Sequence, residues 1–278
     1  MSSYKILVFL PIWGRHEITE RCFQGLRRLS EYNPHKYLID IVAVVSEDWA
    51  KKLCDKYNYR FVYAENFPLG AKLNTGLEYC MKFQFDYLMT LGSDDFIDNR
   101  LLDVYDEYFK QGTELFGTDK ICFVQGDKAK MVSYSLTIAG AGRCIKKSVI
   151  EKICCNNVKV EYLCSMGGTL GCYSKGDIAY MKKHTALHMA KKYMIRILSE
   201  PCVNLWEDER QNALDHNSNM KLITNGASNK CLDIKEPLIV DVKGEDNIWG
   251  YDYIEGEEIN KTEIKIPELC EPVTLTVE

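Results

Sequence analysis

Residues 88–98, LMTLGSDDFID, run from an apolar stretch straight into two adjacent aspartates, Asp94 and Asp95. Neighbouring carboxylates repel each other and raise each other's pKa unless a cation lies between them. The pair therefore belongs either to a solvated turn or to a cation site. In a solvated turn, Asp98 would cap a helix that begins near Asn99. The position of this stretch in the fold helps to decide between the solvated turn and the cation site.

The stretch is one of several strands that alternate with helices over the first 125 residues. Continuous apolar runs are typical of strands covered on both faces, and they occur at 5–12, 39–45, 59–64, 86–91 and 120–126. Segments with helical spacing lie between them, at 17–29, 46–57, 69–83 and 99–112. This alternation predicts an α/β fold of right-handed βαβ units, with a mostly parallel central sheet and flanking helices.

In such a sheet, ligands bind beyond the carboxyl ends of the strands. The loops expected at this edge are 11–15, 46–48, 65–70 and 92–98. Asp94 and Asp95 lie in the last of these loops, and this position favours the cation site.

The pattern weakens after residue 126. It indicates helices at 143–152, 177–198 and 206–216, an irregular segment at 160–176, and strands at 237–243 and 262–266. We predict two parts, an α/β domain at 1–232 and a strand-containing C-terminal extension at 233–278. The extension has 13 acidic and 4 basic residues, so its net charge is −9. Because the whole chain has a net charge of −5, residues 1–232 carry +4. A mildly basic domain favours an anionic ligand.

The composition predicts a soluble, cytoplasmic protein. Of its 278 residues, 46% are hydrophobic and 27% are charged, as in ordinary globular proteins. No apolar stretch approaches the ~18–20 residues of a membrane span. The N-terminus, MSSYKILVFL, has no secretory pattern. The twelve cysteines are therefore expected to be free thiols.

Four motifs over residues 4–110 resemble those of family-2-like glycosyltransferases of the GT-A fold. Pro11 and Arg15 form a Pro-x-x-x-Arg opening, and Glu47 follows the second strand. Residues 68–80, PLGAKLNTGLEYC, are similar to the family's Gly-x-x-x-x-Asn-x-Gly helix, and LGSDDFID stands where the family has its Asp-x-Asp. The resemblance implies a GT-A-like (Rossmann-like) fold. It also implies transfer of a hexose or pentose from a UDP-linked or other nucleoside-diphosphate sugar to an acceptor hydroxyl, with inversion.

The resemblance further implies a divalent cation, Mn²⁺ or Mg²⁺, held by Asp94 and Asp95. Such a cation stabilises the diphosphate leaving group. Gly92 departs from the family, which has its first aspartate there. Because of this departure, the protein could bind the metal only weakly, or Ser93 could make the ribose contact in place of the missing aspartate. The residues expected to bind the donor are Pro11, Trp13, Arg15, Glu47, Lys72, Asn74, Ser93, Asp94 and Arg143.

Several of these side chains have a structural alternative. Arg15 could pair with a neighbouring acid instead of phosphate, and Trp13 could be a packing anchor. Lys72 lies one residue off the apolar stripe of its helix, so it points either to the cleft or to solvent. Arg143 follows a glycine-rich turn, Gly140-Ala141-Gly142, that lacks the full phosphate-loop motif.

The general base is expected at Asp208, with Glu207 as the second candidate. Both belong to Trp206-Glu207-Asp208-Glu209, which is similar to the Glu-Asp motif of the resembled family. The base would remove a proton from the attacking hydroxyl. The structural alternative is that these carboxylates stabilise the first turn of a helix.

The acceptor expected from the resemblance is a glycan or a hydroxylated DNA base. Basic residues at 143–152 and 182–196 would suit a phosphate backbone, although such runs are also typical of solvated helix faces. The extension at 233–278 could support oligomerisation. A nucleotidyltransferase is a rival class, but it would have a glycine-rich loop where PIWGRHE (11–17) has one glycine. A non-catalytic binding or assembly protein on the same scaffold is the third class, and Gly92 favours it.

Overall fold

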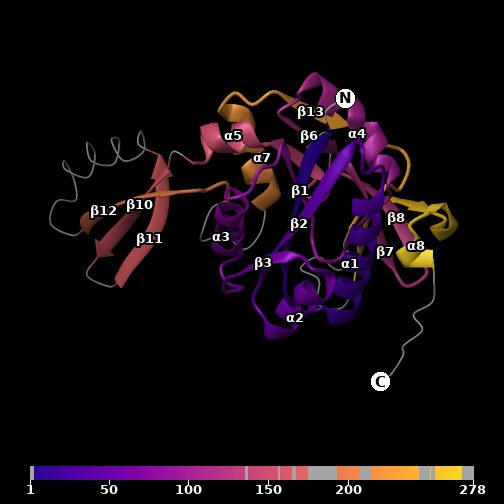
Figure 1. The fold of residues 1–278 in the computed structure, drawn as a ribbon, viewed down its shortest axis with the longest axis horizontal. Coiled ribbons are helices and arrows are strands. Elements are labelled where there is room, and N and C mark those ends of the chain that lie inside the picture. The colour runs from indigo at the N-terminus through magenta and orange to yellow at the C-terminus, as the bar shows by residue number, and fades with distance from the viewer. Residues whose placement is uncertain are drawn as a thin grey trace.

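A computed structural model describes residues 3–134, 137–155, 157–164, 167–174, 193–206, 214–243, 251 and 254–270. Its main body is a sheet flanked by helices (Figure 1). The sheet has seven strands in the order β13-β6-β9-β4-β1-β2-β3. In chain order these are β1 (Tyr4–Ile12), β2 (Tyr37–Val45), β3 (Arg60–Tyr63), β4 (Tyr87–Thr90), β6 (Leu115–Thr118), β9 (Arg143–Lys146) and β13 (Asn229–Leu232).

The sheet is mostly parallel. Strand β1 pairs in parallel with both β2 and β4, and β2 pairs in parallel with β3. Strand β9 is antiparallel to β4 and β6. The helices are α1 (His16–Glu31), α2 (Asp48–Tyr57), α3 (Leu69–Cys80), α4 (Arg100–Gln111), α5 (Lys147–Ile153) and α7 (Leu214–Thr224). A mixed α/β fold with a mostly parallel central sheet is thereby confirmed.

Helices cover both faces of this sheet because β1 is apolar on both faces. Successive side chains of a strand point to opposite sides. Ile6, Val8 and Leu10 therefore belong to one hydrophobic cluster, with residues of α1, α2 and α4. Leu7 and Phe9 belong to the other, with residues of α3, α5 and α7. All five side chains are at most 1% exposed.

A second sheet includes residues from the expected C-terminal extension. It has five strands in the order β15-β8-β7-β14-β5. Strand β14 lies between β7, to which it is parallel, and β5, to which it is antiparallel. The strand expected at 237–243 is thus confirmed, and it is an interior strand. The bounds are β5 (Asp95–Ile97), β7 (Lys120–Gln125), β8 (Lys128–Ser133), β14 (Ile239–Val242) and β15 (Glu257–Ile259).

A third, antiparallel sheet corrects two expectations. It consists of β10 (Asn157–Cys164), β11 (Gly167–Ser174) and β12 (Tyr193–Cys202). Residues 160–164 and 167–174 are therefore strands, and not irregular as the sequence pattern indicated. The helix expected at 177–198 is wrong over 193–198, while residues 175–192 lie outside the described part. In β12, Tyr193, Ile195 and Ile197 recur with a period of two, which is typical of a strand.

Three smaller corrections concern element boundaries. The helix expected at 143–152 begins only at Lys147, because Arg143–Lys146 fills the gap between β4 and β6 in the main sheet. The strand expected at 262–266 is wrong, because Lys261–Glu263 forms a 3₁₀ turn that the Asn260 side chain caps. Of the helix expected at 206–216, residues 207–213 are outside the described part, and α7 begins at Leu214. No described helix is long and apolar enough to span a membrane.

Candidate functional site

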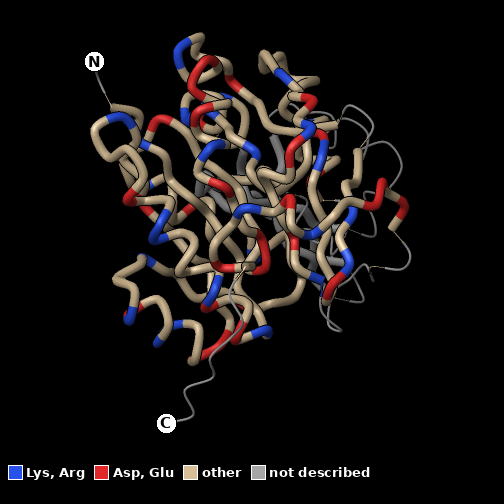
Figure 2. The backbone as a smooth tube through the Cα atoms, turned by 90° about the vertical axis from the view of Figure 1, so that its right-hand side faces the viewer, with Lys and Arg blue, Asp and Glu red and all other residues tan. Residues whose placement is uncertain are grey.

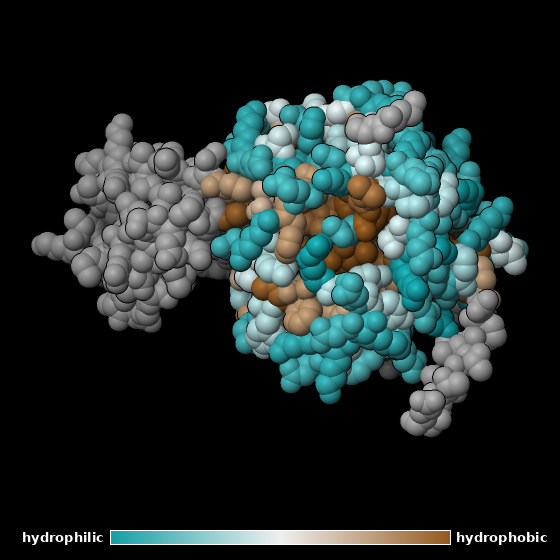
Figure 3. Space-filling view, viewed as in Figure 1, coloured by the Kyte–Doolittle hydropathy of each residue, from teal (hydrophilic) through white to brown (hydrophobic). Residues whose placement is uncertain are grey.

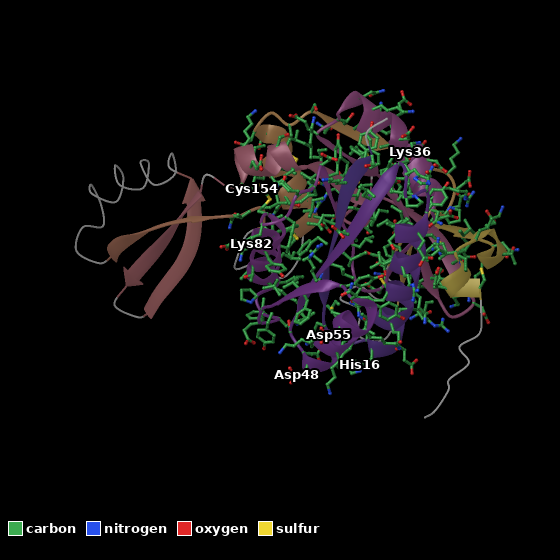
Figure 4. The ribbon with its side chains drawn as sticks, viewed as in Figure 1. His16, Lys36, Asp48, Asp55, Lys82 and Cys154 are labelled. Atoms are coloured by element: carbon green, nitrogen blue, oxygen red, sulfur yellow. The ribbon has the colours of Figure 1, made fainter. Side chains whose placement is uncertain are left out.

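Three aspartates from two distant parts of the chain meet at the edge where the parallel strands end. Asp94 and Asp95 follow β4, and Asp241 lies on β14. Asp241 stands opposite Asp95 in the antiparallel pairing of β14 with β5. One carboxylate oxygen from each aspartate lies within 4.8 Å of the others. His16 is the first residue of α1, after β1, and Asp48 is the first residue of α2, after β2. Both are labelled in Figure 4, where they show the position of this edge.

Gly92 is part of this acidic site. Its backbone N–H donates a hydrogen bond to the Asp95 carboxylate. A Cβ at position 92 would lie 2.9 Å from Asp94 Oδ1 and 2.9 Å from Asp95 Oδ2. The glycine therefore leaves room for the two carboxylates, and an aspartate at this position would collide with both of them.

The site concentrates negative charge in a buried place. Burial, and then the neighbouring Asp94, raise the pKa of Asp95 to about 7. Burial, followed by Asp94 and Asp95, also raises the pKa of Asp241. Two basic side chains offset part of this charge: Arg15 pairs with Asp94, and Lys243 Nζ lies 2.7 Å from Asp241 Oδ2.

These residues fit a divalent cation. Asp241 Oδ1 is buried and has no hydrogen-bond partner among the described residues. An unpaired buried carboxylate oxygen is costly, and a cation would satisfy it. Mn²⁺ and Mg²⁺ prefer carboxylate oxygens and complete their coordination with water and phosphate oxygens.

Lys72 and Glu47 brace the loop that follows β1. Lys72 is 1% exposed, and its Nζ donates to the Ile12 carbonyl at 2.7 Å and to Asn66 Oδ1 at 2.9 Å. Burial lowers the pKa of Lys72 to about 8. Glu47 Oε2 accepts from the Gly14 N–H at 2.6 Å. Lys72 therefore points inward to the backbone of this loop, not to solvent.

Asn74 connects α3 to the segment that precedes the expected general base. Its Oδ1 accepts from the N–H groups of Leu205 and Trp206, each at 3.0 Å, and its Nδ2 donates to the Trp206 carbonyl at 2.7 Å. Glu207 and Asp208 themselves lie outside the described residues.

A cavity of about 250 Å³ opens beside the aspartates. Its wall includes Pro11 and Trp206 as well as the three acids, together with Phe9, Leu69, Leu73 and Leu214. Arg143 also belongs to the wall, but it is fully buried, and its Nη1 binds Ser218 and Asn219 of α7, both at 2.9 Å. In Figure 3, apolar residues form a patch surrounded by polar ones on the face seen in that view.

Six of the expected donor-binding residues lie outside this wall, namely Arg15, Glu47, Lys72 and Asn74, whose contacts are given above, and Trp13 and Ser93. Trp13 is 52% exposed at the end of β1, so it is not a packing anchor. Ser93 is buried, at 2% exposure.

Sequence reasoning missed Asp241, Lys243 and Trp206 as parts of the site. The signal for Asp241 was present, because IVDV (239–242) places an acid inside the strand predicted at 237–243. The pairing of this strand with Asp95 could not be read from the sequence.

The comparison with solved structures supports the fold. The chain aligns with S. aureus TarS 1-349 at a TM-score of 0.53 and 13% identity, over 86% of this chain and 60% of that one. It therefore spans less than two thirds of TarS 1-349. The arrangement of strands and helices is thus GT-A-like, as the sequence indicates.

Two further structures are less similar. The mannosyltransferase PcManGT from Pyrobaculum calidifontis, in complex with GDP-Man and Mn²⁺, gives a TM-score of 0.47 at 10% identity, over 87% of this chain and 57% of that one. The 4-diphosphocytidyl-2C-methyl-D-erythritol synthase from Anaerococcus prevotii gives 0.43 at 11% identity, over 87% and 92%. Both scores are too low to distinguish the two activities. No family model matches the chain, and no curated protein matches it.

Proposed function

We propose that this protein is a family-2-like glycosyltransferase that moves a hexose or pentose from a nucleoside-diphosphate sugar to an acceptor hydroxyl. One observation carries the proposal: the buried Asp94 and Asp95 and the partly buried Asp241, which has one buried, unpaired oxygen, meet at the carboxyl edge of a GT-A-like sheet and open on a cavity. This edge is where such sheets bind their ligands.

Asp94, Asp95 and Asp241 would hold Mn²⁺ or Mg²⁺. The cation supplies positive charge to the diphosphate as the bond to the sugar breaks. The loop after β1, which Lys72 and Glu47 brace, would bind the donor. Within that loop we assign Trp13 to the nucleobase, because its ring is exposed beside the strand end.

The general base is proposed at Asp208, with Glu207 as the second candidate. Both follow directly on Trp206, which Asn74 holds in the wall of the cavity. Either carboxylate would take the proton of the acceptor hydroxyl, and direct displacement would invert the sugar.

A glycan is the favoured acceptor. Basic and acidic residues are interspersed along the described backbone in Figure 2, whereas a DNA-binding protein usually gathers its basic residues on one face. A hydroxylated DNA base is the second candidate acceptor.

A thermal-shift experiment tests the donor site. Wild type and Asp94→Asn are heated with UDP, GDP, ADP or CDP, each with and without Mn²⁺, and UDP is tried first. A ligand that binds the folded state raises its stability in proportion to the logarithm of concentration over Kd. We expect a Mn²⁺-dependent shift with one nucleotide that Asp94→Asn loses. A well-folded sample that shows no shift would refute the transferase assignment and support the non-catalytic scaffold.

Product analysis separates the two enzyme classes. A glycosyltransferase releases a nucleoside diphosphate from a nucleotide sugar, whereas a nucleotidyltransferase releases pyrophosphate from a nucleoside triphosphate. Pyrophosphate as the product would overturn the proposal in favour of the second class.

A further inference from the structure

The two basic side chains at the acidic site are held very differently. The Lys243 side chain is 8% exposed, its Nζ lies 2.7 Å from Asp241 Oδ2, and it stands 4.3 Å from the centre of the Phe123 ring. The Arg15 side chain is 25% exposed and reaches Asp94 through one nitrogen, Nη1. Lys243 is thus enclosed by the protein, while Arg15 has room to leave.

The backbone at Arg15 is also unusual. Arg15 has left-handed dihedrals, φ 54° and ψ 51°, and precedes the first residue of α1 without a side-chain cap. A non-glycine residue in this region is strained, and a cation is unfavourable at the positive end of a helix. An asparagine or a glycine adopts these left-handed dihedrals more readily and carries no positive charge. An arginine that costs stability at this position indicates a functional role.

Charge counting suggests what that role is. With all three carboxylates ionised, the triad carries −3, and Lys243 and Arg15 together offset two of these charges. A divalent cation together with Lys243 would neutralise the triad completely. Arg15 would then no longer be required to neutralise Asp94, and its guanidinium could bind an anion next to the cation.

We propose that Arg15 is an exchangeable counter-ion that couples metal binding to donor binding. It pairs with Asp94 while the cation is absent and binds the donor diphosphate once the cation has replaced it. The guanidinium suits both partners because its planar set of N–H donors matches carboxylate and phosphate alike. This inference rests on the proposed donor site and adds a specific consequence: Mn²⁺ and the nucleoside diphosphate bind cooperatively.

The test measures the two ligands separately. Binding of Mn²⁺ alone is followed by the electron paramagnetic resonance signal of free Mn²⁺. Binding of UDP, or of the diphosphate that the thermal-shift screen selects, is followed by calorimetry at saturating Mn²⁺. The variants are Arg15→Asn, which should keep the fold, and Arg15→Lys, which keeps the charge. Arg27→Gln is the control, because Arg27 lies exposed on α1 and pairs only with Glu31 among the described residues.

The proposal predicts effects of opposite sign. Arg15→Asn should bind Mn²⁺ alone about fivefold more tightly, since a partly exposed ion pair of about 1 kcal/mol no longer competes. The same variant should bind the diphosphate about tenfold more weakly, because a charge-assisted contact to phosphate is lost. Arg15→Lys should fall between wild type and Arg15→Asn, and Arg27→Gln should match wild type.

Failure of this inference can be told from failure of the proposed function. If wild type binds Mn²⁺ and the diphosphate but Arg15→Asn leaves both affinities unchanged, or weakens both, Arg15 is not an exchangeable counter-ion. If wild type binds neither ligand, the donor site itself is refuted and the role of Arg15 falls with it.

Discussion

Gly92 provides a test that sets the structure against the family pattern. The resembled family has an aspartate at this position, so the pattern alone predicts that Gly92→Asp would strengthen metal binding. The structure predicts the reverse. A Cβ at position 92 would stand 2.9 Å from oxygens of both Asp94 and Asp95. A fourth carboxylate would also add repulsion to a site that already raises the pKa of Asp95.

The magnitude follows from the contact distances. Ordinary contacts of a Cβ begin near 3.4 Å, so each carboxylate would have to move by about 0.5 Å in a packed site. Overpacking of this kind costs about 1–3 kcal/mol. In a protein of this size each kcal/mol lowers Tm by about 2–4 °C. We therefore expect Gly92→Ala to lower Tm by roughly 2–12 °C and to weaken Mn²⁺ binding, and Gly92→Asp to do both more strongly.

The assay is thermal unfolding and Mn²⁺ titration on the two variants, with Gly25→Ala as the control. Gly25 lies within α1, and its added Cβ would meet Glu268 at an ordinary 3.5 Å. Because alanine is the better helix former, this control should be neutral or more stable by up to about 1 kcal/mol. A Gly92→Asp protein with unchanged Tm and tighter Mn²⁺ binding would show that the packing argument is wrong.

Three further predictions concern the same region. Asp241→Asn should weaken Mn²⁺ binding at least roughly tenfold, because the affinity of such cation sites depends on the number of charged ligands. Equal affinity of the variant and wild type in a Mn²⁺ titration would exclude Asp241 from the site. Mn²⁺ affinity should fall as the pH decreases from about 8 to about 6, because a proton on Asp95, whose pKa is raised to about 7, competes with the cation; a flat profile in titrations at three pH values would contradict this. Asn74→Ala should lower the free energy of unfolding, measured by urea denaturation, by about 3–5 kcal/mol, because it leaves three buried backbone groups without their Asn74 partner. The control is Thr75→Ala at the exposed neighbouring residue, which should lower this free energy by less than about 1 kcal/mol.

The first half of the fold was predictable because its strands, including the four-residue β3 and β4, lie in apolar runs separated by segments with helical spacing. The segments at 5–12 and 39–45 correspond to Tyr4–Ile12 and Tyr37–Val45, in which residues 6–10 and 41–45 alternate between two buried faces. The later strands were harder to recognise. Strand β9 follows a glycine-rich turn, has a basic residue at each end and runs directly into α5, and β11 contains three glycines, so neither has a clear period.

Only the part of the site that is formed by residues adjacent in the sequence was predictable. The position of Asp94 and Asp95 follows from a strand that ends in acids, and the structure places both at the expected edge. The pairing of Arg15 with Asp94 spans 79 residues, and the meeting of Asp95 with Asp241 depends on the register of β14. Contacts of this kind are set by the packing of the whole chain, and no local pattern encodes them.

Strand β14 has a consequence for how the protein is made. It fills the place between β5 and β7, so the second sheet cannot close until residues 239–242 have left the ribosome. Until then Asp94 and Asp95 lack their third carboxylate, and the edges of β5 and β7 stay open to other strands. Pairings between such distant segments form slowly and late. Among the described residues, completion of the sheet and assembly of the three carboxylates are therefore the same event, and a nascent chain brings Asp94, Asp95 and Asp241 together only when β14 has paired.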